Sequence, residues 1–189
     1  MSTYGITGGI GSGKSFVCRM LEERGYKVFY CDAEAKRLIR EDSIVRNKLQ
    51  ELVGKELYAE DGTLQKAILS AFICKSRKQA DAVDAIVHPR VRKSFLAWEA
   101  EQLKAGEKNL YMECALLFEA GFDELVEKTV FVNSDEDKRL EHLMQRDGIS
   151  MAKARQWMEL QMPEAEKRQR ADIVINNDYT SLPDISEII

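Results

Sequence analysis

Gly8-Gly9-Ile10-Gly11-Ser12-Gly13-Lys14-Ser15 is the stretch that decides the fold of this chain. It fits the phosphate-binding pattern G-x-x-x-x-G-K-[ST] at every fixed position. The short apolar segment Tyr4-Gly5-Ile6 precedes it and predicts a strand, whereas the segment from Phe16 to Arg24 predicts a helix. Strand, glycine-rich loop and helix, in this order, form the context in which such a loop binds phosphate.

The chemistry of the loop follows from its residue types. Glycines let the backbone wrap closely around an anion, and the loop N–H groups then donate hydrogen bonds to phosphate oxygens. Lys14 is long enough to reach the β- and γ-phosphates, and the Ser15 hydroxyl is a ligand for Mg²⁺. We therefore predict a site for ATP with Mg²⁺, formed by Gly9, Gly11, Ser12, Gly13, Lys14, Ser15 and Phe16.

The composition is that of a globular protein of 189 residues, 44% hydrophobic and 32% charged. The net charge of −4 gives no basic field that would favour nucleic acid as a partner. The four cysteines lack C-x-x-C spacing, which argues against a zinc site and a disulfide framework. No run approaches the ~18 apolar residues of a membrane span. We expect a cytoplasmic protein without membrane contact, either a monomer or a small homo-oligomer.

Further strands are predicted where short apolar runs end in polar residues, at Tyr26–Cys31, Asn109–Cys114, Lys128–Asn133 and Ile173–Asn176. The sequence therefore predicts an α/β fold, a P-loop NTPase core of about five parallel strands flanked by helices. We expect the nucleotide-binding core to comprise residues 1–32, 106–133 and 165–189.

Two helical regions interrupt this core. Residues 33–105 have helical periodicity and little strand signal, so they predict an inserted substrate subdomain. Pro89 is expected to break one helix there and to begin the next. Residues 134–164 predict a pair of helices that forms a small lid, with the first helix ending at Gly148.

Asp32 follows one predicted strand and Glu113 lies near the end of another, and ligands of parallel sheets bind at the edge where strands end. Asp32 is a candidate for accepting the proton of an attacking hydroxyl and holding that substrate, or for holding Mg²⁺. The alternative is that Asp32 is the N-cap of a helix that begins at Ala33. Glu113 is a candidate for Mg²⁺, because a carboxylate in a core strand needs a partner; a place at a strand end is the alternative.

Other candidates lie later in the chain. Arg139 and Arg146 are seven residues apart and share a helix face, so either could bring positive charge to a transferring phosphoryl group. We assign this catalytic role to Arg146, although a solvated charged face is the alternative for both. His88 is a candidate for binding substrate or for a structural cap, and Asn177 for contacting a nucleotide base or for forming a turn.

The order and spacing of several short motifs resemble the dephospho-coenzyme A kinase family over essentially the whole chain. The ordered series carries the resemblance, since no single motif after the loop is specific. It consists of Gly5–Ser15, Asp32, Asp61–Leu64, His88-Pro89, Leu116–Glu119, Gln145–Asp147, Gln161, Ala171-Asp172 and Asn177.

This resemblance implies transfer of the ATP γ-phosphate to the ribose 3′-hydroxyl of dephospho-coenzyme A. It also implies a nucleotide-binding core, a helical subdomain that binds the coenzyme A substrate and a lid. Asp32 matches the acid proposed as the family's catalytic base, and Glu119 falls in a motif that implies substrate binding.

The chain departs from the family pattern at several positions. Tyr30 stands where the family usually has a first Asp, and Phe16 where Thr often follows the loop. Ala115 replaces a common Pro, and Arg139 and His142 replace Gln and Arg in the lid helix. The family commonly extends past the position of Ile189, so we expect a trimmed or short carboxyl end.

Two alternatives use the same loop. Another small P-loop kinase, acting on a nucleoside monophosphate or a shikimate-like compound, would share most of these features. A regulatory GTPase or nucleotide-dependent interaction module should carry D-x-x-G and N-K-x-D motifs. Neither occurs, since Asn47-Lys48 is followed by Leu49-Gln50.

Overall fold

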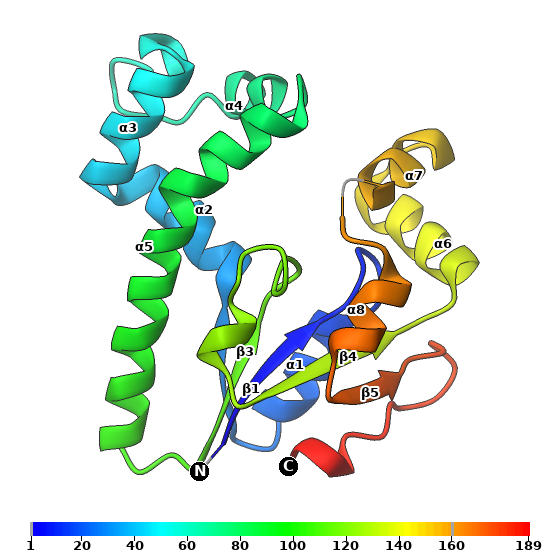
Figure 1. The fold of residues 1–189 in the computed structure, drawn as a ribbon. Helices are drawn as coiled ribbons and strands as arrows, with labels where there is room; N and C mark the ends of the chain where they lie inside the picture. The colour runs from blue at the N-terminus through cyan, green and yellow to red at the C-terminus, as the bar shows by residue number, and fades with distance from the viewer. Residues whose placement is uncertain (1, 160) are drawn as a thin grey trace. The chain divides into compact units, whose positions relative to one another are not determined.

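The computed structural model describes residues 2–159 and 161–189, which form one sheet of five strands. The strands are β1 (Ser2–Thr7), β2 (Lys27–Tyr30), β3 (Asn109–Glu113), β4 (Lys128–Asn133) and β5 (Ile173–Asn176). Their order across the sheet is β2-β3-β1-β4-β5, and every pairing is parallel (Figure 1). The predicted α/β class is confirmed, and β1 lies at the centre of the sheet.

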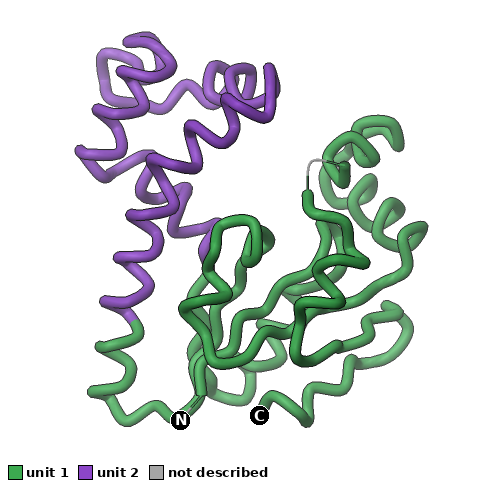
Figure 2. Tube along the Cα trace, in the orientation of Figure 1, with its two compact units in different colours: residues 1–30, 99–189 green, residues 31–98 purple. Residues whose placement is uncertain are grey.

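The described part of the chain divides into two compact units, residues 1–30 with 99–189, and residues 31–98 (Figure 2). The first unit contains the sheet. The second contains α2 (Cys31–Glu41), α3 (Ser43–Val53), α4 (Lys66–Ile73), the short 3₁₀ helix η1 (Lys55–Leu57) and most of α5 (Arg77–Lys104). In the part of the chain described, no helix has the length and apolar character needed to cross a membrane.

Helix α1 (Lys14–Glu22) and the sheet share a hydrophobic core. Val17 and Leu21 are four residues apart on one face of the helix, and both are fully buried. Tyr111 of β3 lies in the same core, where its ring stacks on that of Tyr4 with 5.3 Å between centroids. The Tyr111 hydroxyl donates a hydrogen bond to the carbonyl of Ile188, which fastens the C-terminal segment to the core.

Helix α5 runs through Pro89, so the prediction that this residue separates two helices is wrong. Proline removes one backbone hydrogen bond and crowds the preceding turn, but these costs are local. The buried side chains continue at helical spacing on both sides of it, with Val83 and Val87 before and Val91 and Phe95 after. The burial of this continuous apolar face offsets the cost of the proline.

Two helices follow β4 and lie side by side, α6 (Glu136–Asp147) and α7 (Met151–Glu159) (Figure 1). The Asp135 carboxylate caps α6 by accepting hydrogen bonds from the N–H groups of Asp137 and Lys138. Gly148 ends the helix with a left-handed φ of 63°, as its position predicts. Leu143 and Ala154 are fully buried between the two helices.

A further helix, α8 (Glu164–Arg170), leads into β5, and the sequence did not predict it as a separate element. It has only seven residues, and most of them are charged. Such a segment has no apolar stripe from which a helix could be read.

Candidate nucleotide-binding site

The glycine-rich loop joins β1 to α1 at the carboxyl edge of the sheet. Gly11 and Gly13 have φ values of 81° and 89°, which side chains rarely adopt. A Cβ on Gly13 would lie 2.1 Å from Asn177 Nδ2, and one on Gly11 would lie 2.7 Å from the carbonyl oxygen of Arg139. These two positions therefore require glycine both for their backbone conformation and for their close packing.

Lys14 folds back over the loop that it follows. Its ammonium group donates to the carbonyl oxygens of Gly8 and Gly9 at 2.9 and 3.2 Å, and its side chain is buried. Gly13 is the N-cap of α1 and, as a glycine, has no side chain that could cap the helix. The first turn also lacks acids, so the N-terminal N–H groups and the partial positive charge of the helix favour an anion.

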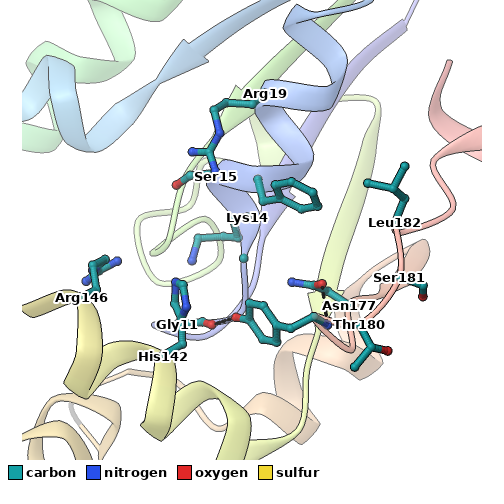
Figure 3. Close-up of a pocket in the computed structure, with 13 residues that line it drawn as sticks. Gly11, Lys14, Ser15, Arg19, His142, Arg146, Asn177, Thr180, Ser181 and Leu182 are labelled. Carbon is teal, nitrogen blue, oxygen red and sulfur yellow. Dashed lines mark hydrogen bonds between the residues drawn. The ribbon is translucent and has the colours of Figure 1, made fainter.

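A pocket of about 750 Å³ adjoins the loop and has the size expected of a nucleotide site (Figure 3). Its wall comes from the loop and α1, from α6, and from the segment after β5. The lining residues are Gly11, Gly13, Lys14, Ser15, Phe16, Arg19, His142, Arg146, Asn177, Tyr179, Thr180, Ser181 and Leu182. The structure thus brings together loop residues and two later candidates, Arg146 and Asn177.

Asn177 is buried beside the loop and uses its side-chain amide on backbone groups. Its Nδ2 donates to the carbonyl of Ser12 at 2.9 Å, and its Oδ1 accepts from the N–H of Tyr179 at 3.2 Å. These bonds hold the loop and shape the turn after β5. A contact of Asn177 with a nucleotide base stays a prediction.

Arg146 reaches the same pocket from the last turn of α6. Its side chain is 53% exposed and forms an ion pair with Asp147 at 2.7 Å. This hydrogen bond with Asp147 raises the pKa of Arg146, so the guanidinium stays charged. Arg146 therefore lines the pocket beside the loop, and its phosphate-binding and catalytic roles stay predictions.

A second set of side chains supports the other side of the loop. Gln161 accepts a hydrogen bond from the N–H of Ile10 at 2.8 Å, and Glu164 lies so close to Gly9 that a Cβ there would be 1.8 Å from its Oε1. Arg139 pairs with Glu164 at 2.5 Å and is buried. Burial raises the pKa of the Glu164 carboxyl.

The sequence did not identify Glu164 as a residue of the loop's surroundings, and it marked Gln161 only as part of a motif. Neither residue stands at a strand end or in a spacing that indicates contact with phosphate. Their role in supporting the loop depends on the return of the chain from α7 to α8.

The acids predicted at the sheet edge follow neighbouring strands. Glu113 ends β3, is buried, and is in register with Ile6 of β1 and Tyr30 of β2. Asp32 comes two residues after β2 and is exposed in the first turn of α2. Because α2 already begins at Cys31, Asp32 lies within the helix instead of forming its N-cap.

Among the described residues, no group of three or more acidic, histidine or cysteine side chains forms a metal cluster. Mg²⁺ commonly binds to one or two protein oxygens, with water and substrate phosphates completing its shell. The exposed Ser15 hydroxyl on the pocket wall fits that kind of site. The roles of Asp32 and Glu113 toward the metal stay predictions.

Glu119 and His88, predicted with Asp32 as substrate contacts, have protein partners. Glu119 Oε1 lies 2.9 Å from the fully buried Lys167 ammonium and accepts the N–H of Met162 at 2.9 Å. His88 Nε2 lies 3.5 Å from Asp84 Oδ1, one turn earlier on α5. The described contacts of Glu119 are those of a structural anchor, and substrate binding by either residue stays a prediction.

Comparison with known proteins places these features in a family. The family model described as "Dephospho-CoA kinase" matches residues 2–183. A dephospho-CoA kinase of Salinibacter ruber is 42% identical over 180 residues, covering 95% of this chain and 90% of the relative. One from Bacteroides fragilis is 38% identical and covers 98% of this chain and 90% of the relative.

Solved structures agree with this match. A Thermus thermophilus protein superposes with a TM-score of 0.78 at 33% identity, covering 93% of this chain and 88% of that one. The dephospho-CoA kinase of Campylobacter jejuni has a TM-score of 0.67 at 23% identity, over the same shares of the two chains, and shows the same fold.

Proposed function

The chain belongs to the dephospho-CoA kinase family, and on that premise we propose that it transfers the γ-phosphate of ATP to the ribose 3′-hydroxyl of dephospho-coenzyme A. The observation that carries the proposal is the pocket at the loop, where Lys14, Ser15 and Arg146 line one cavity. Such a cavity supplies the positive charge and the backbone donors that a triphosphate needs.

The reaction is an in-line displacement at the γ-phosphorus. The acceptor hydroxyl oxygen forms the new P–O bond, the bond to the β-phosphate oxygen breaks, and ADP leaves. Asp32 receives the hydroxyl proton and orients the acceptor. A carboxylate is a weak base toward an alcohol, so positioning and charge stabilisation by Lys14 and Arg146 supply most of the catalysis.

Mg²⁺ would be held by the Ser15 hydroxyl together with the phosphates of ATP, with Asp32 and Glu113 as further oxygen ligands. When bound, the ion neutralises charge that develops on the phosphate oxygens. Ser15 and Lys14 occupy the first turn of α1, so one helix end orients both the ammonium and the hydroxyl.

We also propose a cytoplasmic enzyme, because its substrates are nucleotides and its four cysteines form no disulfide with one another. We propose that it acts as a monomer or a small homo-oligomer, since the residues of the site described come from one chain.

The test is to incubate the protein with ATP, Mg²⁺ and dephospho-coenzyme A and to identify products by mass. We expect coenzyme A and ADP in equal amounts. Adenosine, AMP and shikimate, offered in place of dephospho-coenzyme A, should be poor acceptors. A Lys14→Ala variant is the control and should lose turnover and bind ATP weakly. Failure of the wild-type chain to form coenzyme A would contradict the proposed function.

A further inference from the structure

Tyr179, in the segment after β5, has an unusual backbone conformation. Its φ of 61° is in the left-handed region, and no other non-glycine residue of the described chain has a positive φ. For a bulky aromatic residue this conformation costs free energy, so surrounding contacts must hold it in place. Such strain is often found where a side chain has a function.

The contacts of Tyr179 join the phosphate-binding loop to the lid helix. Its hydroxyl donates a hydrogen bond to the carbonyl of Gly11, and its N–H donates to Asn177 Oδ1. Its ring stacks on the imidazole of His142 in α6, with 5.1 Å between centroids and 27° between planes. Beside it, Lys138 of α6 donates to the carbonyl of Asp178 at 2.8 Å.

The stacked pair constrains the direction of a third residue. His142 and Arg146 are four residues apart on α6 and therefore share one face of that helix. Both line the pocket with Lys14, and Figure 3 shows their side chains rising from α6 on the side of the loop. The contact between Tyr179 and His142 therefore helps to set the direction in which the Arg146 side chain leaves α6, while the ion pair with Asp147 holds the Arg146 guanidinium.

We propose that Tyr179 is a positioning residue for phosphoryl transfer, which bonds to the loop at Gly11 and, through His142, aims Arg146 at the phosphates. This inference rests on the proposed function for its activity readout. The cost of the strained backbone is offset by holding two parts of the site in one geometry. Misplacing a charged group by about 1 Å costs on the order of 10²-fold in rate.

Two variants separate the ring from the backbone. Tyr179→Asn keeps a residue that tolerates the left-handed conformation but removes the ring and its hydroxyl. Tyr179→Phe keeps the ring and removes the hydroxyl, and with it the bond to Gly11. We expect Tyr179→Asn to lower kcat by about tenfold with a change in KM for ATP of less than about threefold, as for an interaction made mainly in the transition state. The decrease in kcat should be smaller for Tyr179→Phe.

Crossing these variants with Arg146→Ala tests the route of the effect. If Tyr179 acts through Arg146, then Tyr179→Asn should lower kcat by less than about twofold once Arg146 is absent. On the helix side, His142→Ala should resemble Tyr179→Asn, and His142→Phe should restore kcat because it keeps the stack. Losses that multiply in the double variant would overturn the proposal, as would His142→Phe behaving like His142→Ala.

Calorimetric affinities for ATP and ADP give a readout that needs no turnover. Arg146→Ala and Tyr179→Asn should lower the ratio of ATP to ADP affinity by the same factor, within the limit of about threefold expected for KM, because the first removes the positive charge near the γ-phosphate and the second misdirects it. Equal loss of ATP and ADP binding in Tyr179→Asn would instead show that Tyr179 only supports the loop, or that its ring only contacts the base. If the wild-type chain forms no coenzyme A, the proposed function fails while this ratio still tests Tyr179.

Discussion

At the scale of single residues, some side chains in and around the phosphate-binding loop would contact the nucleotide, and others hold the loop in place. Lys14, Ser15 and Asn177 line the pocket, and Asn177 and Gln161 bond to the backbone of the loop from two sides. Asp32 belongs to neither set, since it follows β2 and is exposed in the first turn of α2. Replacing Asp32 should therefore slow the chemical step and leave ATP binding nearly unchanged.

The variant Asp32→Asn keeps the shape of the side chain and removes its capacity to accept a proton. We expect kcat to fall by about 10²-fold or more, in the range that general-base catalysis supplies. ATP affinity should change by less than about twofold, because the amide oxygen of Asn can still bind Mg²⁺ but cannot accept the proton. Steady-state kinetics and calorimetry measure the two effects. The control is Glu41→Gln in the same helix, an exposed acid paired with Arg37 that should leave kcat unchanged. Near-normal turnover of Asp32→Asn would refute the assignment of the base.

At the scale of the element, α5 shows how packing overrides a local signal. Pro89 is exposed, while the buried face of the helix continues across it from Val87 to Val91. The proline therefore weakens the helix without contributing to the core.

Replacing Pro89 with alanine should stabilise the full chain by about 1 kcal/mol. Alanine restores the missing N–H and has a higher helix propensity, although the unfolded chain becomes less restricted. Urea unfolding followed by circular dichroism measures the change. Lys93→Ala, at another exposed position of α5, is the matched control and should stay within about 0.5 kcal/mol of the wild type. Loss of stability in Pro89→Ala would mean that the helix needs the local geometry that proline imposes.

At the scale of the whole molecule, one buried ion pair joins distant parts of the chain. Lys167 of α8 is fully buried, and its ammonium lies 2.9 Å from Glu119 Oε1 and donates to the carbonyl of Ala115 at 2.9 Å. Glu119 also accepts the N–H of Met162, next to Gln161, which supports the phosphate-binding loop. The pair therefore fastens the segment after β3 to the segment that holds the loop.

Removing only the positive charge should be costly, because Glu119 would stay buried without its partner. We expect Lys167→Met to lower the free energy of unfolding by about 3 kcal/mol or more. The double variant Lys167→Met with Glu119→Leu should recover much of this loss, since it removes both charges. Urea unfolding of the two single variants and the double variant gives the coupling. Additive losses would show that the two residues act independently.

The sequence by itself determined the features that depend on neighbours along the chain. Glycine spacing before Lys14 predicted the phosphate-binding loop, and apolar runs placed β4 and β5 at the bounds that the structure has. The end of α6 at Gly148 was predictable for the same reason, because a left-handed cap is a local event. The ordered motifs were enough to indicate the family, which the comparisons confirm.

Only the tertiary structure decided which side chains hold the site together. The bond from Ile10 to Gln161 spans 151 residues, and that from Tyr179 to Gly11 spans 168. Tertiary packing also decided that α5 continues through Pro89, because burial of its continuous apolar face outweighs the local cost of the proline. Contacts between distant residues depend on how the chain returns to the loop, and burial energy is gained only once the elements have packed. A local sequence pattern therefore predicts neither the contacts between distant residues nor the energy gained by burial.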